Sequence, residues 1–268
     1  MLKDITLGQY FPGNSVVHRL DPRTKLIALI VYIVALFSAE NWLSYAMVFV
    51  FLSGAVAISE IPVKAIVRGM KPLVMILVFT GILNLLFTAG ETVLVQFWRI
   101  TITLEGVTMA VFMVIRILML ISATFLLTYT TSPISLTDGL ESLLSPLKKL
   151  HLPIHELAMM MCIALRFIPT LIEETDKIIS AQKARGADFE NGSLLQRVKA
   201  LVPILVPLFI SAFRRADELA TAMECRCYQG GDGRTKMKLL RFKRLDYITF
   251  FLLPVLAGAV IMVANMGL

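Results

Sequence analysis

Five blocks of mostly apolar residues, separated by short polar stretches, dominate the pattern of the chain. A helix needs about 20 mostly apolar residues to cross hydrocarbon about 30 Å thick. The first block is short, rising only about 21 Å at 1.5 Å per residue, so it needs basic side chains that snorkel at its start. The pattern predicts an all-α fold, a polytopic membrane helix bundle of about five spans: Leu26–Ala39, Trp42–Ser59, Pro72–Thr88, Val107–Tyr129 and Tyr247–Met266.

Basic residues mark the side of the membrane on which each loop lies. They gather before the first block and between the second and third, and such loops are typically cytoplasmic. We therefore expect a cytoplasmic N-terminus and an external C-terminus. Residues 1–131 are predicted to hold the N-terminal membrane helices, residues 132–246 a cytoplasmic insertion of amphipathic helices, and residues 247–268 the C-terminal membrane helix. The basic residues concerned are Arg19, Arg23, Lys25, Lys64, Arg68 and Lys71.

The insertion contains several helical patterns. Leucines from Leu136 to Leu147 recur at helical spacing and predict one amphipathic helix that stops near Pro146. Two further apolar segments, Leu157–Ile168 and Leu201–Phe213, are about twelve residues long and are bounded or interrupted by proline. Segments of that length are more typical of buried or interfacial helices than of spans.

Two helices of the insertion are predicted to end alike. One runs from Pro169 to Arg185 and is expected to stop at Gly186 as a left-handed cap. The other runs from Phe209 to Arg226, and an offset of 41 residues superposes the two arginines. A cation in the last turn gains about 0.3–1 kcal/mol from the helix dipole, which would explain either arginine alone. Their pairing favours a docking function.

Composition supports a membrane protein. The 268 residues are 57% hydrophobic and 17% charged, where a soluble domain carries about 25% charged residues. The net charge of +7 would raise the question of nucleic acid in a soluble protein. Here the excess lies in loops beside apolar blocks, as anionic cytoplasmic lipid favours. We expect the lipid bilayer and no nucleic acid as a partner.

No constellation of residues points to catalysis. The glycine-rich stretch from Gly230 to Thr235 lacks the spacing and the lysine of a phosphate-binding loop. His151 and His155 have metal-like spacing, but Pro153 separates them and no third ligand is evident. The adjacent Glu173 and Glu174 are interpreted as a solvated face. The sequence thus predicts a non-enzymatic chain with no catalytic residue, no metal site and no cofactor of its own.

Arg116 stands ten residues into the fourth apolar block. An ionisable residue at such a depth costs about 2.5–3.5 kcal/mol and usually faces the bundle interior. It either lines a solute pathway or ties helices together through carbonyl groups, and both interpretations stay open.

Three sets of residues resemble a known family. They are His18-Arg-Leu-Asp-Pro-Arg-Thr-Lys25, Ala164-Leu-Arg-Phe-Ile-Pro169 followed by Ala181-Gln-Lys-Ala-Arg-Gly186, and Met223-Glu-Cys-Arg-Cys-Tyr228. Together they resemble the transmembrane T component of energy-coupling factor transporters, also called the cobalt-transport membrane protein family, over nearly the whole chain.

The resemblance implies a multi-pass protein of a prokaryotic inner or plasma membrane. It implies two ABC-type ATPase subunits that use ATP, and a membrane-embedded S component that captures a vitamin or a transition-metal ion. The family's two Ala-Arg-Gly signatures dock on the ATPases, which carries over to Ala184, Arg185 and Gly186 and, with a departure, to Cys225, Arg226 and Cys227. Because Cys227 replaces the glycine, we expect Gly230 or Gly231 to end the second helix.

Two other classes are weighed against this one. The permease subunit of an ordinary ABC importer would also dock on ATPases, but its Glu-Ala-Ala-x3-Gly loop is not found. A membrane-bound lipid-modifying enzyme would need interfacial carboxylates or a metal site, which are not found either. The transported substrate is not predicted, since in the resembled family specificity lies in the S component.

Overall fold

The protein forms two compact units in a computed structural model that describes residues 10–88, 92–97, 100–150, 152–187, 194–230 and 239–265. The bundle unit comprises residues 8–139 and 240–268. The insertion unit comprises residues 140–239. The chain therefore leaves the bundle unit after Gly139 and returns to it at Leu240.

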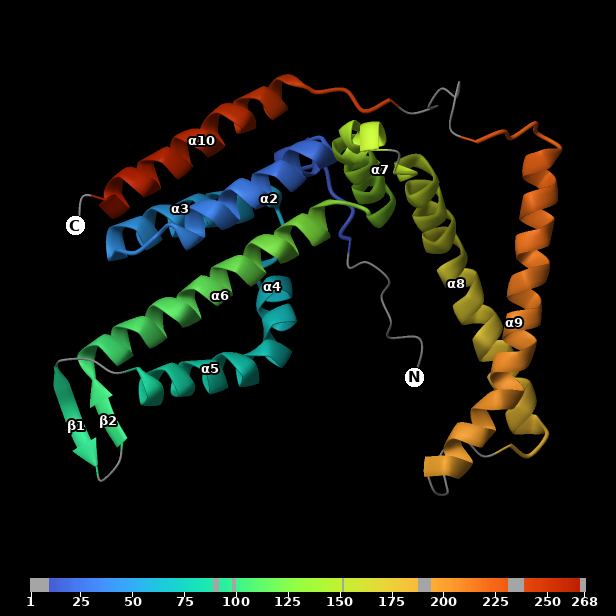
Figure 1. Cartoon of the computed structure of the whole chain (residues 1–268), viewed down its shortest axis with the longest axis horizontal. Helices are drawn as coiled ribbons and strands as arrows, with labels where there is room; N and C mark the ends of the chain where they lie inside the picture. The colour runs from blue at the N-terminus through green and yellow to red at the C-terminus, as the bar shows by residue number, and fades with distance from the viewer. Residues whose placement is uncertain are drawn as a thin grey trace. The chain divides into compact units, whose positions relative to one another are not determined.

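Four helices make the core of the bundle unit (Figure 1): α2 (Pro22–Phe37), α3 (Trp42–Ser59), α6 (Leu104–Thr130) and α10 (Arg244–Asn265). A single turn, α1 (Val16–Arg19), precedes them. α2 begins where the Asp21 side chain accepts from the Arg23 N–H and Pro22 occupies the first helical position, both favoured features of a helix start. The buried side chains that hold these helices together include Tyr32, Leu36, Tyr45, Val48, Met119 and Val260.

A second layer of the bundle unit lies along α6. After α4 (Val63–Met70) and the short turn η2 (Lys71–Leu73), the chain continues in α5 (Val74–Phe87), which packs against α6. Leu77 is the buried residue of α5, and Met75 and Phe87 are more than 80% exposed. Apolar side chains that point away from the rest of the protein are typical of a helix that faces lipid. An antiparallel hairpin of β1 (Val93–Phe97) and β2 (Ile100–Thr103), which the hydrophobic pattern did not predict, joins α5 to α6.

Five described helices are long and apolar enough to cross a membrane, which confirms a multi-pass helical membrane protein. Three of the expected spans fall on α3, α6 and α10, and a fourth, Pro72–Thr88, overlaps Val63–Phe87 except for its last residue. The expected first span falls on α2, whose 16 residues rise about 24 Å, and it is not among the five. The fifth helix selected by length and composition is Ile154–Ala184, which lies in the insertion that the sequence predicts to be cytoplasmic.

The insertion unit consists mainly of two long helices. α7 (Pro133–Leu144) and the turn η3 (Ser145–Leu150) lead from the bundle to α8 (Ile154–Ala184), which is followed by α9 (Leu194–Glu224). The prediction of separate short helices over 157–168 and 201–213 was wrong. α8 continues through Pro169, and α9 through Pro203 and Pro207. Each proline removes one backbone donor and its ring crowds the carbonyl group four residues earlier, but the helical patterns on its two sides join and the helix continues.

Candidate functional site

The end of α8 presents the first of the two predicted docking arginines. The Gly186 N–H donates to Lys183 O at 3.0 Å, and the Ala187 N–H donates to Gln182 O at 3.0 Å. This pair of bonds is the Schellman motif, in which a left-handed residue follows the helix. Gly186 is that residue, with φ of 89°, so its predicted role as a cap is confirmed. Arg185 occupies the last position before it, and both it and Ala184 are exposed.

The end of α9 has the same geometry. The Cys227 N–H donates to Glu224 O at 2.8 Å, and the Tyr228 N–H donates to Met223 O at 3.0 Å. Cys227 is left-handed, with φ of 57°, so Arg226 stands where Arg185 stands in the first copy. The side chains of Cys225, Arg226 and Cys227 are exposed. The two signatures therefore match in backbone conformation although they differ in sequence.

The expectation that Gly230 or Gly231 ends the second helix was wrong. Gly230 is left-handed, with φ of 97°, but it lies three residues beyond the turn that closes α9, and Gly231 is outside the described residues. Cys227 performs the capping role itself. For a residue with a Cβ atom the left-handed conformation costs about 1–2 kcal/mol, which a glycine would avoid.

Replacing Cys227 with glycine is therefore expected to stabilise the end of α9 by about 1 kcal/mol. Amide hydrogen exchange over residues 225–228 should slow by about fivefold, since 1.4 kcal/mol corresponds to a factor of ten. Gly186→Ala is the matched opposite change and should speed exchange at the end of α8. Faster exchange in Cys227→Gly would contradict the assigned backbone conformation.

Within the part of the chain that the structure describes, neither predicted docking arginine forms a side-chain hydrogen bond or ion pair, whereas other charged residues of the same helices do. Glu174 of α8 accepts from Ser211 Oγ of α9 and forms an ion pair with Arg215 at 3.2 Å. The Arg215 guanidinium also lies 5.8 Å from the centre of the Phe167 ring. The interpretation of Glu174 as part of a solvated face was thus wrong, because the sequence did not reveal that α9 packs on that side.

Glu174 and Arg215 are also 41 residues apart, the same offset that relates Arg185 to Arg226. Gln182 of α8 contacts Pro203 of α9 through Nε2 and O at 3.4 Å. The residue numbers of the contacting positions thus decrease along α9 as they increase along α8, so the two helices run antiparallel. Each arginine follows its own member of the ion pair by eleven residues. Arg185 and Arg226 accordingly lie at opposite ends of the α8–α9 pair.

Arg116 of α6 contacts the end of α2, the turn after it and the first part of α3. Its Nε donates to Tyr45 Oη at 2.9 Å, and its Nη2 donates to Ala39 O at 3.1 Å. The guanidinium also lies 5.3 Å from the centre of the Phe37 ring. These contacts favour the interpretation in which Arg116 ties helices together. A role in a solute pathway stays a prediction.

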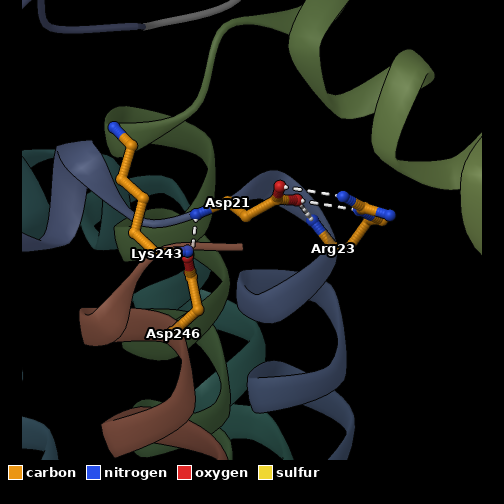
Figure 2. Close-up of polar contacts among 4 residues, drawn as sticks. All are labelled: Asp21, Arg23, Lys243 and Asp246. Carbon is orange, nitrogen blue, oxygen red and sulfur yellow. Dashed lines mark hydrogen bonds and ion pairs between the residues drawn. The ribbon is translucent and has the colours of Figure 1, made fainter. Parts of the chain in front are cut away.

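The motif from His18 to Lys25 forms a second cluster, at the start of α2. Asp246, the third residue of α10, is fully buried. It accepts from the Asp21 N–H at 2.8 Å and from the Lys243 N–H at 2.6 Å (Figure 2). Sequence reasoning did not single out Asp246, because its partner is 225 residues away. One signal was present: Arg-Leu-Asp occurs at 19–21 and again at 244–246.

Lys25, which lies ahead of the first expected span, is 7% exposed. Burial lowers its pKa from 10.5 to about 8, although the Asp246 and Asp21 carboxylates oppose the shift. The folded chain releases this proton before the unfolded chain does, so the unfolded state binds more protons between pH 8 and 10.5, and the free energy of unfolding rises across that window. The full gain is about 3 kcal/mol at 1.36 kcal/mol per pKa unit.

Raising the pH from 8 to 10 should therefore shift the unfolding temperature of the detergent-solubilised chain upward relative to that of Lys25→Met. In Lys25→Met this contribution to the pH dependence should vanish, whatever the absolute stability of the variant. An identical pH dependence in both chains would rule out a buried, destabilised ammonium group at this position.

These features define a class of protein: a multi-pass helical membrane protein whose insertion carries two matching, arginine-bearing helix ends. The model of the cobalt transport protein family, CbiQ, matches residues 13–237, and the chain belongs to that family.

Several relatives cover almost the whole chain. The energy-coupling factor transporter transmembrane protein EcfT of Heliobacterium modesticaldum is 56% identical over 247 residues, 92% of each chain. The EcfT proteins of Thermosediminibacter oceani and Bacillus subtilis are 54% and 49% identical, covering 97% and 96% of this chain and 98% and 97% of their own. The resemblance inferred from the motifs is confirmed.

Proposed function

We propose that the chain is the coupling subunit of an energy-coupling factor importer. It transmits the ATP-driven motion of two ABC-type ATPase subunits to a membrane-embedded S component that takes up a vitamin or a transition-metal ion. The chain hydrolyses no ATP and holds no cofactor, and its insertion lies in the cytoplasm. The relatives, which are energy-coupling factor transporter transmembrane proteins, support the role in a transporter, and the two helix ends support docking on two ATPases.

The observation that carries this proposal is the repeated helix end. Arg185 and Arg226 each occupy the position before a left-handed residue, are exposed, and lie at opposite ends of an antiparallel helix pair. A guanidinium group presents five donors in a planar fork that suits a carboxylate. Two equivalent helix ends at opposite ends of the pair are better suited to binding two equivalent partners than to binding a single one.

Mass spectrometry of the intact complex tests the proposal. The tagged chain is isolated from the membranes of its native cell in mild detergent. We expect one chain with two ATPase subunits and one additional small, apolar membrane protein. A complex with ATPases but no such membrane protein would instead indicate the permease of an ordinary ABC importer, and a chain recovered alone would refute ATP-driven coupling.

A further inference from the structure

The motif from His18 to Lys25 is not used by the docking proposal, yet it contacts both segments through which the chain passes between the two units. The chain leaves the bundle unit after Gly139 and re-enters it at Leu240. The leaving segment consists of the end of α6, residues Thr131 and Ser132, and the first part of α7. The returning segment consists of residues 240–246. All contacts described next lie within the bundle unit.

Lys25 holds the leaving segment. Its Nζ donates to Thr130 O at 2.9 Å and to Thr131 Oγ1 at 3.1 Å. Thr130 is the last residue of α6, where carbonyl groups lack partners within the helix and a cation is favoured. α7 packs closely against the same helix start. Gly139 of α7 lies so near Pro22 that a Cβ atom added to Gly139 would be 2.9 Å from Pro22 Cβ.

Asp21 and Arg23 hold the returning segment. The buried Asp246 carboxylate bonds the backbone N–H of Asp21 with one oxygen and that of Lys243 with the other. It therefore joins the start of α2 to the start of α10. The Arg23 guanidinium pairs with the Asp21 carboxylate at 3.1 Å and lies 4.2 Å from the centre of the Phe242 ring. Figure 2 shows the Lys243 side chain pointing away from this carboxylate.

One helix start is thereby fastened to both covalent connections of the insertion. A force that the insertion applies along the chain reaches the bundle through these two connections. Because both are bonded to the residues that begin α2, the force acts on α2, α6 and α10 together. Without these hydrogen bonds, residues 131–132 and 240–243 could move with the insertion while the bundle helices stayed in place.

We propose that the motif from His18 to Lys25 is the joint through which the insertion drives the bundle. Lys25 fastens the leaving segment, and Asp21 and Arg23 fasten the returning segment through Asp246 and Phe242. These are positioning residues, and their role rests on the proposed function, in which the insertion is moved by ATPases.

Asp246→Asn tests the joint with little change of shape. An amide oxygen can accept one of the two backbone bonds, but the amide NH2 group then faces the other N–H donor, and a buried bond is lost. The intact complex in lipid nanodiscs is studied by hydrogen exchange, with and without ATP and orthovanadate, which needs no transported substrate. ATP hydrolysis and the number of bound ATPases are measured on the same samples.

In the wild-type complex, ATP with orthovanadate should change exchange in peptides of α2, α6 and α10. In Asp246→Asn that change should fall by about threefold or more, while ATPase binding and hydrolysis stay within about twofold, as expected when coupling between two sites is lost but each site persists. Lys243→Gln is the matched control. It alters a neighbouring exposed side chain and leaves its backbone donor in place, so the response should be unchanged.

Phe242→Ala is a second, milder variant. Phe242 is 40% exposed, so its truncation should disturb the fold less than a change at a buried residue, and the response should be weakened in the same direction. A full response in both variants would overturn the joint, as would a parallel loss of assembly, hydrolysis and response, which would indicate general destabilisation. Absence of bound ATPases from the wild-type chain would instead overturn the proposed function.

Discussion

Replacing both Arg185 and Arg226 with glutamate is expected to abolish recovery of ATPase subunits with the chain. Each guanidinium is exposed in the isolated chain and would be buried by its partner. Removing one member of a buried charged pair costs about 3–5 kcal/mol, so each single change should weaken assembly by about 100-fold or more. Affinity purification from membranes, followed by quantification of the ATPases, measures the effect.

Arg214→Glu is the matched control for this experiment. Arg214 is an exposed arginine of α9 away from its end, so the change of charge is the same but the helix tip is intact. ATPase recovery should match the wild type. Normal recovery with the double variant would mean that both arginines serve only to stabilise the ends of their helices.

The predicted topology can be tested by labelling introduced cysteines, each of which should react either fully or not at all. Glu40 follows α2 and Gln229 follows α9, and both are exposed. The basic residues of the loops place the former outside and the latter in the cytoplasm. In a chain whose native cysteines are replaced by serine, a membrane-impermeant thiol reagent should label Glu40→Cys on intact cells and spare Gln229→Cys.

Permeabilised cells supply the control for the labelling experiment. Both introduced cysteines should then react, which shows that the unlabelled position was protected by the membrane. Labelling of Gln229→Cys but not of Glu40→Cys on intact cells would invert the topology. An inverted topology would also place the insertion outside the cytoplasm, away from the ATP that the proposed ATPases use.

Local patterns predicted the helices and the first helix end well. Gly186 was recognisable because glycine is the residue that adopts a left-handed cap without cost. Cys227 adopts the same conformation in spite of its side chain, which no propensity indicates. The prolines of α8 and α9 were given too much weight, because an interior proline can kink a helix without ending it, and here the helical pattern continues on both sides.

Contacts between distant segments were the part that the sequence did not provide. Asp246 becomes notable only when α10 lies beside the start of α2, and Glu174 only when α9 packs against α8. Arg116 could be singled out as costly, but its partners Tyr45 and Ala39 could not be chosen from among the many groups nearby. Such pairings depend on how helices pack, which hydrophobic periodicity leaves undetermined.

The ion pair between Glu174 and Arg215 has a mechanical consequence. It joins positions related by the same 41-residue offset as the two arginines, so Arg185 and Arg226 are equally far from it, about 16 Å at 1.5 Å per residue. Because Gln182 and Pro203 join the same helices a second time, the pair is held as one body. A rotation of this body by about 10° about the ion pair would displace each helix end by about 3 Å at that distance, so the two proposed docking partners would be moved equally.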